Sequence, residues 1–199
     1  MPQPVYALGA PGGVLNAVSV AKSTTIAAFI DVSSYFKSDL VCQVDTTATA
    51  PTAGTSFSAY SVYGNATTNT LSSAVVVGAT SISVASKTAI EPNQKIALIA
   101  AATGVGEIVT VTAAPTGTGP YTVAISATLN AYATSDHVYL MAQTTSLTVS
   151  PMTVTPAAST DYSLPLLLET GQWVLAINNT DTAQPVSVTV SRNDLQKYQ

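Results

Sequence analysis

The residue best suited to acid–base chemistry in this sequence is His137, the single histidine, which directly follows Asp136. An imidazole titrates near neutral pH, so a histidine beside a carboxylate is a candidate general acid–base pair. Adjacent residues of a strand point to opposite faces of the sheet, however, so the two side chains would not act together. We therefore expect His137 to be a structural residue.

Other catalytic and ligand-binding patterns are weaker. Serines are abundant, but no Gly-x-Ser-x-Gly motif marks one of them as a nucleophile. The ten carboxylates are scattered, so their spacing favours no pair for glycoside hydrolysis. Asn178, Asn179 and Asp181 come closest to a calcium loop, and we expect an ordinary turn there. Gly104-Val105-Gly106 lacks the lysine of a phosphate-binding loop and is also expected to be a turn.

Cysteine and histidine counts limit metal and disulfide chemistry. Cys42 is the single cysteine, so the chain cannot form an internal disulfide, and one histidine with one cysteine cannot build a zinc cluster. The sequence predicts no catalytic residue, metal site or cofactor. We expect a protein that is not an enzyme.

Charge is scarce in this chain of 199 residues. Hydrophobic residues make up 47% of the sequence and charged residues 8%, against about 25% charged residues in typical soluble proteins. The net charge of −4 argues against a nucleic-acid partner, because phosphate binding needs clustered cations. The apolar runs at 74–79 and 96–102 are shorter than the roughly 20 residues that span a bilayer, and the N-terminus lacks the pattern of a secretion signal. We expect neither a membrane segment nor export.

Alternation of apolar residues predicts strands rather than helices, which favours an all-β protein. The abundance of Ala, Thr, Ser and Val agrees with this, because small and β-branched residues suit pleated surfaces. The predicted strands outside the middle of the chain lie at 24–30, 40–45, 57–63, 162–168, 173–178 and 186–190. The turn-rich segment 178–185 predicts a hairpin between the last two, and Pro165 predicts a sheet edge or a bulge.

The middle of the chain has shorter alternating segments, separated by glycines and prolines about every 12 residues, as is typical of a small β-barrel or sandwich. These segments lie at 81–84, 95–99, 107–112, 121–125 and 137–141. We predict a jelly-roll-like β-sandwich formed by residues 1–66 and 144–199, which serves for attachment. A small β-barrel or sandwich domain is inserted at 67–143. The polar flanks of this insertion suggest that it can be removed without unfolding the rest.

Four stretches of the predicted insertion carry a resemblance to a known family. The stretches GATSISV (78–84), IEPNQKI (90–96), GEIVTVT (106–112) and YTVAI (121–125) resemble a small β-module that recurs in structural proteins of tailed bacteriophages. The resemblance implies a virion component without catalysis, of the capsid decoration, cement or tail accessory type. It supplies no functional residues.

The shortage of charge favours assembly, because a surface of small uncharged residues offers little repulsion against docking. Our leading hypothesis is a capsid decoration or cement protein that binds the head exterior, bridges subunits of the major capsid protein, and is assembled in the cytoplasm of the bacterial host. We expect it to form a homotrimer or homodimer. Two alternatives are a tail- or fibre-associated adhesin that contacts host glycans and a carbohydrate-active β-fold enzyme.

The N-terminal arm, residues 1–15, combines prolines and glycines with apolar side chains. Such a segment is poorly explained as a solvated tail, and a neighbour's groove would supply the burial that it lacks. The alternative is packing on the chain's own sandwich. Trp173 lies in the clearest predicted strand, as a core or interface residue. The candidate interface residues are Val5, Tyr6, Leu8, Val14, Leu15 and Trp173.

Overall fold

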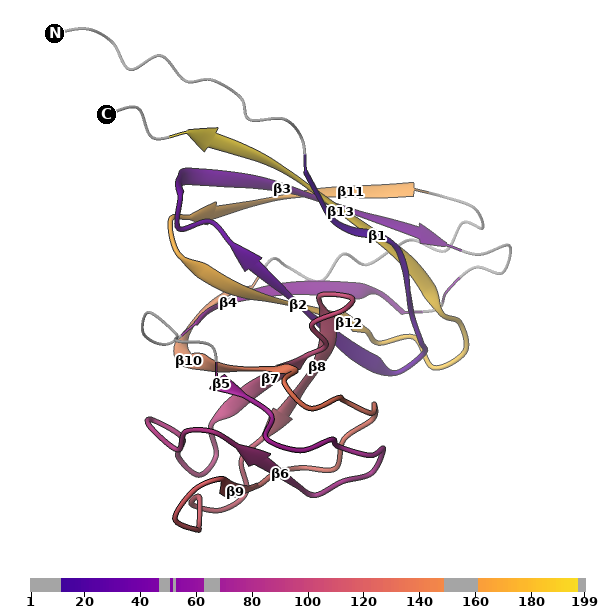
Figure 1. Ribbon diagram of the computed structural model, residues 1–199. Helices are drawn as coiled ribbons and strands as arrows, with labels where there is room; N and C mark the ends of the chain where they lie inside the picture. The colour runs from indigo at the N-terminus through magenta and orange to yellow at the C-terminus, as the bar shows by residue number, and fades with distance from the viewer. Residues whose placement is uncertain (1–11, 47–50, 52, 63–68, 149–160, 197–199) are drawn as a thin grey trace, which may run out of the picture.

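The computed structural model describes residues 12–46, 51, 53–62, 69–148 and 161–196. These residues form strands, turns and loops, and none of them is helical, so the all-β prediction is confirmed. The strands form a four-stranded sheet, a barrel and a short ribbon, stacked as three layers (Figure 1).

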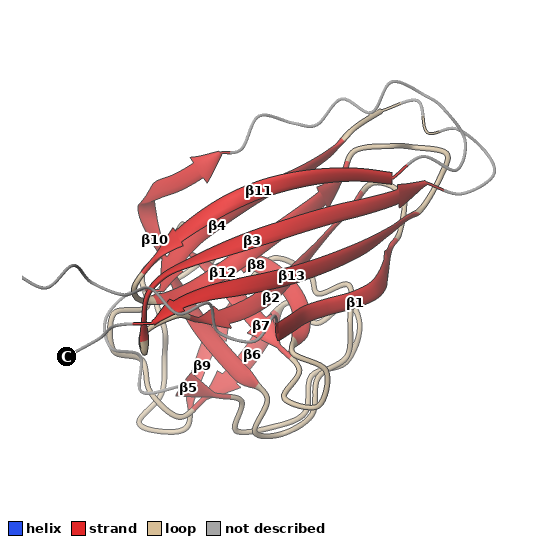
Figure 2. Cartoon of the chain, turned by 90° about the horizontal axis from the view of Figure 1, so that it is seen from above, coloured by secondary structure: helices blue, strands red, loops and turns tan. Residues whose placement is uncertain are grey.

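The first layer, which we call the outer sheet, is antiparallel and has the order β1-β13-β3-β11. Its strands are β1 (Gly12–Val20), β3 (Tyr35–Thr46), β11 (Asp161–Glu169) and β13 (Val186–Gln196). Figure 2 shows this sheet from above, lying over the rest of the molecule. Pro165 lies in β11, at the edge of the sheet, as its missing backbone donor predicts.

The second layer is a closed six-stranded barrel with the order β4-β12-β2-β8-β7-β10, in which β10 pairs again with β4. Its strands are β2 (Thr24–Asp31), β4 (Thr55–Val62), β7 (Lys95–Ile99), β8 (Val105–Thr110), β10 (His137–Thr148) and β12 (Gln172–Asn179). The short strand β5 (Asn69–Thr70) pairs with β10. The third layer is the ribbon of β6 (Ser81–Val84) and β9 (Tyr121–Ala124).

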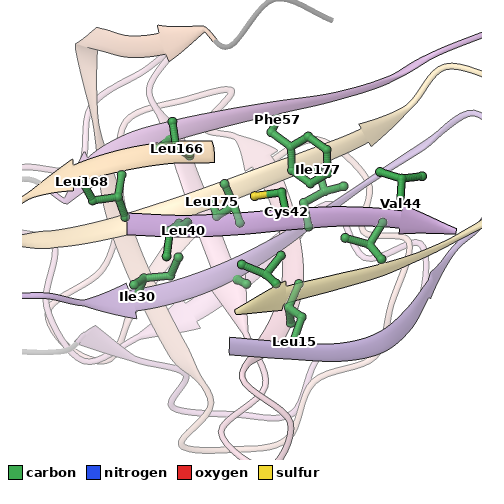
Figure 3. Close-up of a cluster of buried hydrophobic side chains, with 14 of the residues drawn as sticks. Leu15, Ile30, Leu40, Cys42, Val44, Phe57, Leu166, Leu168, Leu175 and Ile177 are labelled. Atoms are coloured by element: carbon green, nitrogen blue, oxygen red, sulfur yellow. The ribbon is translucent and has the colours of Figure 1, made fainter. Parts of the chain in front are cut away.

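Three apolar cores lie within and between these layers. The first lies between the outer sheet and strands β2, β4 and β12, and it includes Leu40, Cys42, Phe57 and Leu175 (Figure 3). The second fills the barrel, and the third lies between β7, β8, β10 and the β6–β9 ribbon. The barrel core contains Ala27, Val62, Ala97, Ile99, Tyr139, Met141 and Val174. The ribbon core includes Ile82, Val84, Ile96, Leu98, Val109, Val123 and Val138.

Strand β7 of the barrel consequently buries both of its faces. Along β7, Ile96 and Leu98 point to the ribbon core, whereas Ala97 and Ile99 point into the barrel. This explains the continuous apolar run at 96–99, because alternate positions of a strand serve opposite faces.

The barrel crosses the predicted boundary between the attachment sandwich and the insertion. β8 pairs with β2, and β10 runs without interruption past residue 143 to pair with β4. The barrel is therefore built from both predicted units instead of lying within residues 67–143. The division into 1–66 with 144–199 and 67–143 stays a prediction, but this shared barrel argues that the rest depends on the insertion.

The predicted hairpin at 178–185 is wrong, because β12 belongs to the barrel and β13 to the outer sheet. A buried polar network fixes the turn by which the chain passes from the barrel strand β12 to the outer-sheet strand β13. The Asn179 amide donates to the carbonyl oxygens of Val20, Ala21 and Gln184 at 3.0 to 3.3 Å. The carboxylate of Asp181 accepts backbone N–H groups from Ala53, Ala183 and Gln184 at 2.6 to 2.8 Å. The turn that local sequence predicts is present, but it links two sheets.

Candidate functional site

The pocket that we call the end pocket lies where the β2–β3 turn meets the β11–β12 turn. Its cavity measures about 340 Å³. The lining residues are Ser33, Ser61, Val62, Thr170, Gly171, Gln172 and Trp173. The two turns are tied together, because the Val32 N–H donates to the Gly171 carbonyl oxygen at 2.8 Å. The pocket walls are therefore fixed by backbone hydrogen bonds.

Asp31, at the end of β2, joins both walls of the end pocket. Its Oδ1 accepts the backbone N–H of Ser33 at 2.9 Å, and its Oδ2 accepts Nε2 of Gln172 at 3.0 Å. Burial acts to raise the pKa of Asp31, but the hydrogen bonds from Ser33 and Gln172 and the charge of Arg192 outweigh it and hold the pKa below its usual value. The carboxylate is thus ionised at neutral pH.

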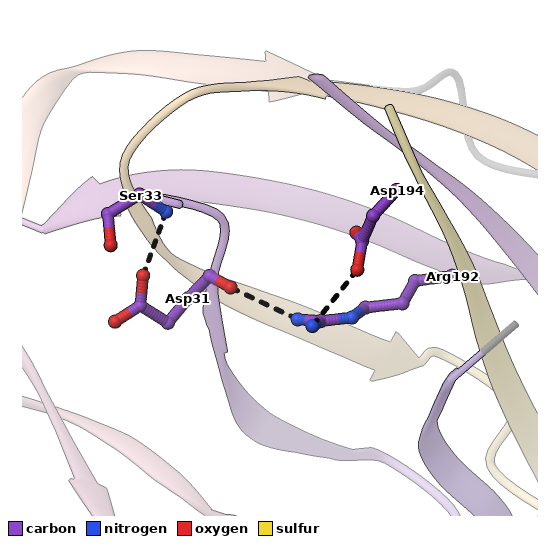
Figure 4. Close-up of polar contacts among 4 residues, drawn as sticks. All are labelled: Asp31, Ser33, Arg192 and Asp194. Carbon is purple, nitrogen blue, oxygen red and sulfur yellow. Dashed lines mark hydrogen bonds and ion pairs between the residues drawn. The ribbon is translucent and has the colours of Figure 1, made fainter. Parts of the chain in front are cut away.

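Arg192 connects the same region to the outer sheet (Figure 4). Its Nη1 donates to the carbonyl oxygen of Asp31 at 3.0 Å, and its Nη2 forms an ion pair with Oδ2 of Asp194 at 3.0 Å. The guanidinium also lies 5.4 Å from the centroid of the Tyr35 ring. Its charge is therefore already balanced by a largely buried carboxylate.

Trp173 is partly buried and lies against the first apolar core as well as in the wall of the end pocket. Its Nε1 donates to the carbonyl oxygen of Glu169 at 2.9 Å, which fixes the indole. Trp173 therefore packs on the core of its own chain, and its interface role stays a prediction. It is also the single tryptophan of the sequence.

Gln172 lies at the start of β12, next to this indole. Its Nε2 is used by Asp31, whereas its Oε1 is covered and has no hydrogen-bond partner among the described residues. An unpaired covered acceptor costs about 1–3 kcal/mol. The protein therefore holds an unsatisfied polar group at the wall of the end pocket.

A second surface lies at the opposite side of the barrel and is apolar. Val76, Val77 and Leu129 are 70%, 63% and 61% exposed. Their loops lie side by side, because the Thr128 hydroxyl donates to the Val76 carbonyl oxygen at 2.9 Å and the Gly78 N–H donates to the Thr128 carbonyl oxygen at 2.8 Å. We call these three side chains the apolar tip. Residues 71–86 and 126–135, which surround it in the sequence, contain no charged residue.

A buried carboxylate supports the apolar tip from below. Glu107 accepts backbone N–H groups from Leu129 and Asn130 at 2.8 and 3.0 Å and the Tyr132 hydroxyl at 3.1 Å. Burial, followed by the charge of Glu107, raises the pKa of Tyr132 far above its usual value, so the phenol stays protonated as a donor. These contacts give Glu107 a structural role in positioning the loop.

The predicted interface residues fall into two groups. Val5, Tyr6 and Leu8 lie outside the described residues, so their interface role stays a prediction. Val14 packs against the first apolar core, and Leu15 is 4% exposed within it. Burial in its own chain accounts for the apolar character of Leu15 without a partner, which matches the alternative of packing on the chain's own sandwich.

His137 and Asp136 do not act as a pair. Asp136 is buried, and its carboxylate accepts backbone N–H groups from Ala101 and Ala133 at 2.9 and 2.8 Å. His137 lies in β10, with its ring centroid 5.8 Å from that of Tyr139. Asp136 therefore fixes the two loops that contain Ala101 and Ala133. This structural role is consistent with the expectation that the neighbouring His137 is also a structural residue.

Two further features concern the part of the chain that the structure describes. It holds no group of three or more His, Cys, Asp or Glu residues placed to bind a metal ion. Within it there is also no helix with the length and apolar character needed to cross a membrane.

Sequence reasoning missed the end pocket. Its lining residues come from three places in the chain, Ser33, 61–62 and 170–173, and no local motif joins them. One signal was available: the single tryptophan directly follows Thr170, Gly171 and Gln172, a polar turn between two apolar strands.

Comparisons with known proteins give weak similarities. No protein-family model and no curated protein matches the sequence. VP17, a capsid protein of bacteriophage P23-77, aligns over 98% of this chain and 100% of its own, with 11% identity and a TM-score of 0.21. The D431N mutant of the VP2 protein of Infectious Bursal Disease Virus, from derived T=1 particles, aligns over 96% of this chain and 40% of its own, with 11% identity and a TM-score of 0.17. Both are viral proteins, but TM-scores this low carry no argument about this chain.

Proposed function

We propose that this chain is a non-enzymatic structural protein of a virion, a capsid decoration or cement protein that binds the head exterior and bridges capsid subunits. The observation that carries the proposal is the apolar tip. Three exposed apolar side chains, Val76, Val77 and Leu129, lie on loops that partly buried hydrogen bonds hold in place, and the adjoining sequence carries no charged residue.

Such a patch needs a partner, because exposed apolar side chains that gather in one place mark interaction sites more often than a scattered distribution does. The loops are ordered by Glu107 and Thr128, so docking would cost little conformational entropy. The low charge of the whole chain acts in the same direction, since it weakens repulsion between neighbouring copies.

The resemblance of residues 78–125 to a module of tailed-phage structural proteins supports the same proposal. In this scheme the partners are the major capsid protein and further copies of the chain, as a homotrimer or homodimer. The location is the capsid surface, after assembly in the cytoplasm of the bacterial host.

The test is to add the purified chain to capsids that lack it and to measure the bound fraction by sedimentation. The variant Val76→Ser/Val77→Ser/Leu129→Ser should bind at least about tenfold more weakly, since each buried apolar side chain contributes roughly 1 kcal/mol or more. Leu167→Ser is the control, because Leu167 is 45% exposed on β11, away from the tip. Equal binding by the triple variant and the control, or failure of the unaltered chain to bind capsids, would contradict the proposal.

A further inference from the structure

We propose that the end pocket binds one uncharged saccharide unit of a glycan. This inference concerns the opposite end of the molecule from the apolar tip and does not depend on capsid binding. It rests on the charge, the chemistry and the rigidity of the pocket walls.

Charge excludes an anionic ligand. A neighbouring carboxylate, Asp31, is ionised at neutral pH and accepts hydrogen bonds from Ser33 and Gln172 of the pocket wall. The neighbouring cation, Arg192, is paired with Asp194 and donates to the Asp31 carbonyl oxygen. A phosphate, sulfate or carboxylate entering the pocket would therefore meet the negative charge of Asp31, and the charge of Arg192 is already balanced by Asp194.

The lining groups fit a ligand with many hydroxyls. The walls carry the hydroxyl side chains Ser33, Ser61 and Thr170, the amide of Gln172 and the indole of Trp173. A sugar ring offers hydroxyl donors and acceptors around its edge and an apolar C–H face that an aromatic ring can cover. A hydroxyl donor could also satisfy Gln172 Oε1, which has no partner among the described residues, after a small rotation of the amide.

Size and rigidity agree with a single unit. The cavity of about 340 Å³ lies at the lower end of the roughly 300–1,000 Å³ range of small-molecule sites. Its two walls are joined by the Val32–Gly171 backbone hydrogen bond and by the Thr170 hydroxyl, which lies 3.5 Å from the Val32 carbonyl oxygen. A pocket whose walls are already ordered binds without a large entropic penalty.

The first experiment screens the full-length chain against an array of neutral, acidic and amino sugars, as free units and as oligosaccharides. Binding is then measured by fluorescence, since Trp173 is the single tryptophan and lies in the pocket. We expect at least one neutral sugar to change the emission with a dissociation constant of about 10 mM or less, and acidic sugars to bind more weakly. Comparison of free units with oligosaccharides shows whether the ligand comes from a polymer.

The second experiment assigns the binding to this pocket by calorimetry. Gln172→Leu should weaken binding by about threefold to tenfold, the value of one or two neutral hydrogen bonds. Trp173→Phe, which keeps an aromatic ring in the core, should weaken it as well. Gln184→Leu is the matched control, because Gln184 lies in the β12–β13 turn away from the pocket. Circular dichroism spectra identical to that of the unaltered chain establish that each variant is folded.

Three results would overturn the proposal. One is that no neutral sugar binds at about 10 mM, and another is that binding is unchanged in both pocket variants. The third is that an amino sugar or a quaternary ammonium ion binds more tightly than every neutral sugar, since the pocket would then be a cation site formed around Asp31. Loss of capsid binding in the apolar-tip variant with intact sugar binding would leave this proposal standing and separates it from the proposed function.

Discussion

Strand β3 of the outer sheet buries one face, whereas strand β7 of the barrel buries two. In β3, Leu40, Cys42 and Val44 are buried, but Val41 and Gln43 between them are partly exposed. In β7, every residue from Ile96 to Ile99 is buried. A substitution in β3 should therefore be tolerated at every second position, and one within residues 96–99 of β7 at almost none.

The largest effect on stability is expected when residues 67–143 are removed and replaced with a short Gly/Ser linker. The deletion takes away β7, β8 and part of β10, which exposes barrel residues such as Ala27 and Val174 to water. We expect the remainder to lose cooperative unfolding, as measured by urea titration followed by circular dichroism. A single cooperative transition would instead show that the outer sheet and strands β2, β4 and β12 form an independent unit.

A smaller change tests the tight packing of the barrel at Gly106. This residue pairs with both Ala27 and Ile99, and a Cβ there would overlap the Leu98 carbonyl oxygen and lie 2.9 Å from Ile99 Cα. Because backbone atoms cannot move aside cheaply, Gly106→Ala should lower the free energy of unfolding by more than about 3 kcal/mol.

The matched control for that substitution is Gly104→Ala in the preceding turn. Gly104 has a φ of +70° and nothing within 4 Å of its would-be Cβ, so the cost is limited to backbone strain of about 1–2 kcal/mol. Equal destabilisation by the two variants in urea unfolding would contradict the close approach of β7 and β8.

Cys42 provides a test of the outer sheet, because it is a free and buried thiol on β3. Burial raises its pKa to about 12, so the thiol is protonated at pH 8 and reacts with a disulfide reagent only after the sheet opens. Val190→Ala, directly across from Cys42 on β13, should speed the reaction by about tenfold or more, since it leaves a cavity in the same core.

The control for this measurement is Ser191→Ala, the next residue of β13, which is on the other face of the strand and half-buried. Its rate should stay close to that of the unaltered chain. If both variants react at the same rate, the one-sided burial of the outer sheet is wrong.

The smallest expected effect is the pH dependence due to Asp31. Its pKa is lower in the folded protein than the roughly 3.9 of an unfolded chain, so its stabilising contribution is present above that value and is lost as the pH falls through the folded pKa. The contribution should be below about 1 kcal/mol, because the carboxylate is exposed and screened by solvent. Asp31→Asn should flatten the fall in stability between about pH 5 and about pH 2, measured by urea unfolding. An unchanged slope would argue against the hydrogen bonds from Ser33 and Gln172.

Local sequence patterns predicted most of the strands, but they missed β1, because it begins among the glycines and prolines of the N-terminal arm. The alternation of Phe57 and Ala59 with Tyr60 and Val62 corresponds to two different cores, because each face of β4 is buried against a separate layer. The edge position of Pro165 was also predictable, because proline lacks the backbone N–H that a central strand would donate.

Long-range pairing was not predictable in the same way. The turn at 178–185 was recognised, but whether it joins neighbouring strands or two sheets depends on partners such as Val20 and Ala53, which are distant in the sequence. The barrel was missed for the same reason, since β2 and β8 meet only in the folded chain. The end pocket depends on Asp31, Gln172 and Arg192, which no spacing rule connects.

The pairing of β1 with β13 has a consequence for biosynthesis. The Ala17 N–H donates to the Thr189 hydroxyl, a contact between residues 172 positions apart. While the ribosome is still translating the codons between them, β1 lacks β13, the one strand among the described residues that pairs with it in the outer sheet, and the nascent chain carries an unpaired strand edge. Because contacts this distant form slowly, we expect the emerging polypeptide to need protection by chaperones until β13 has left the exit tunnel.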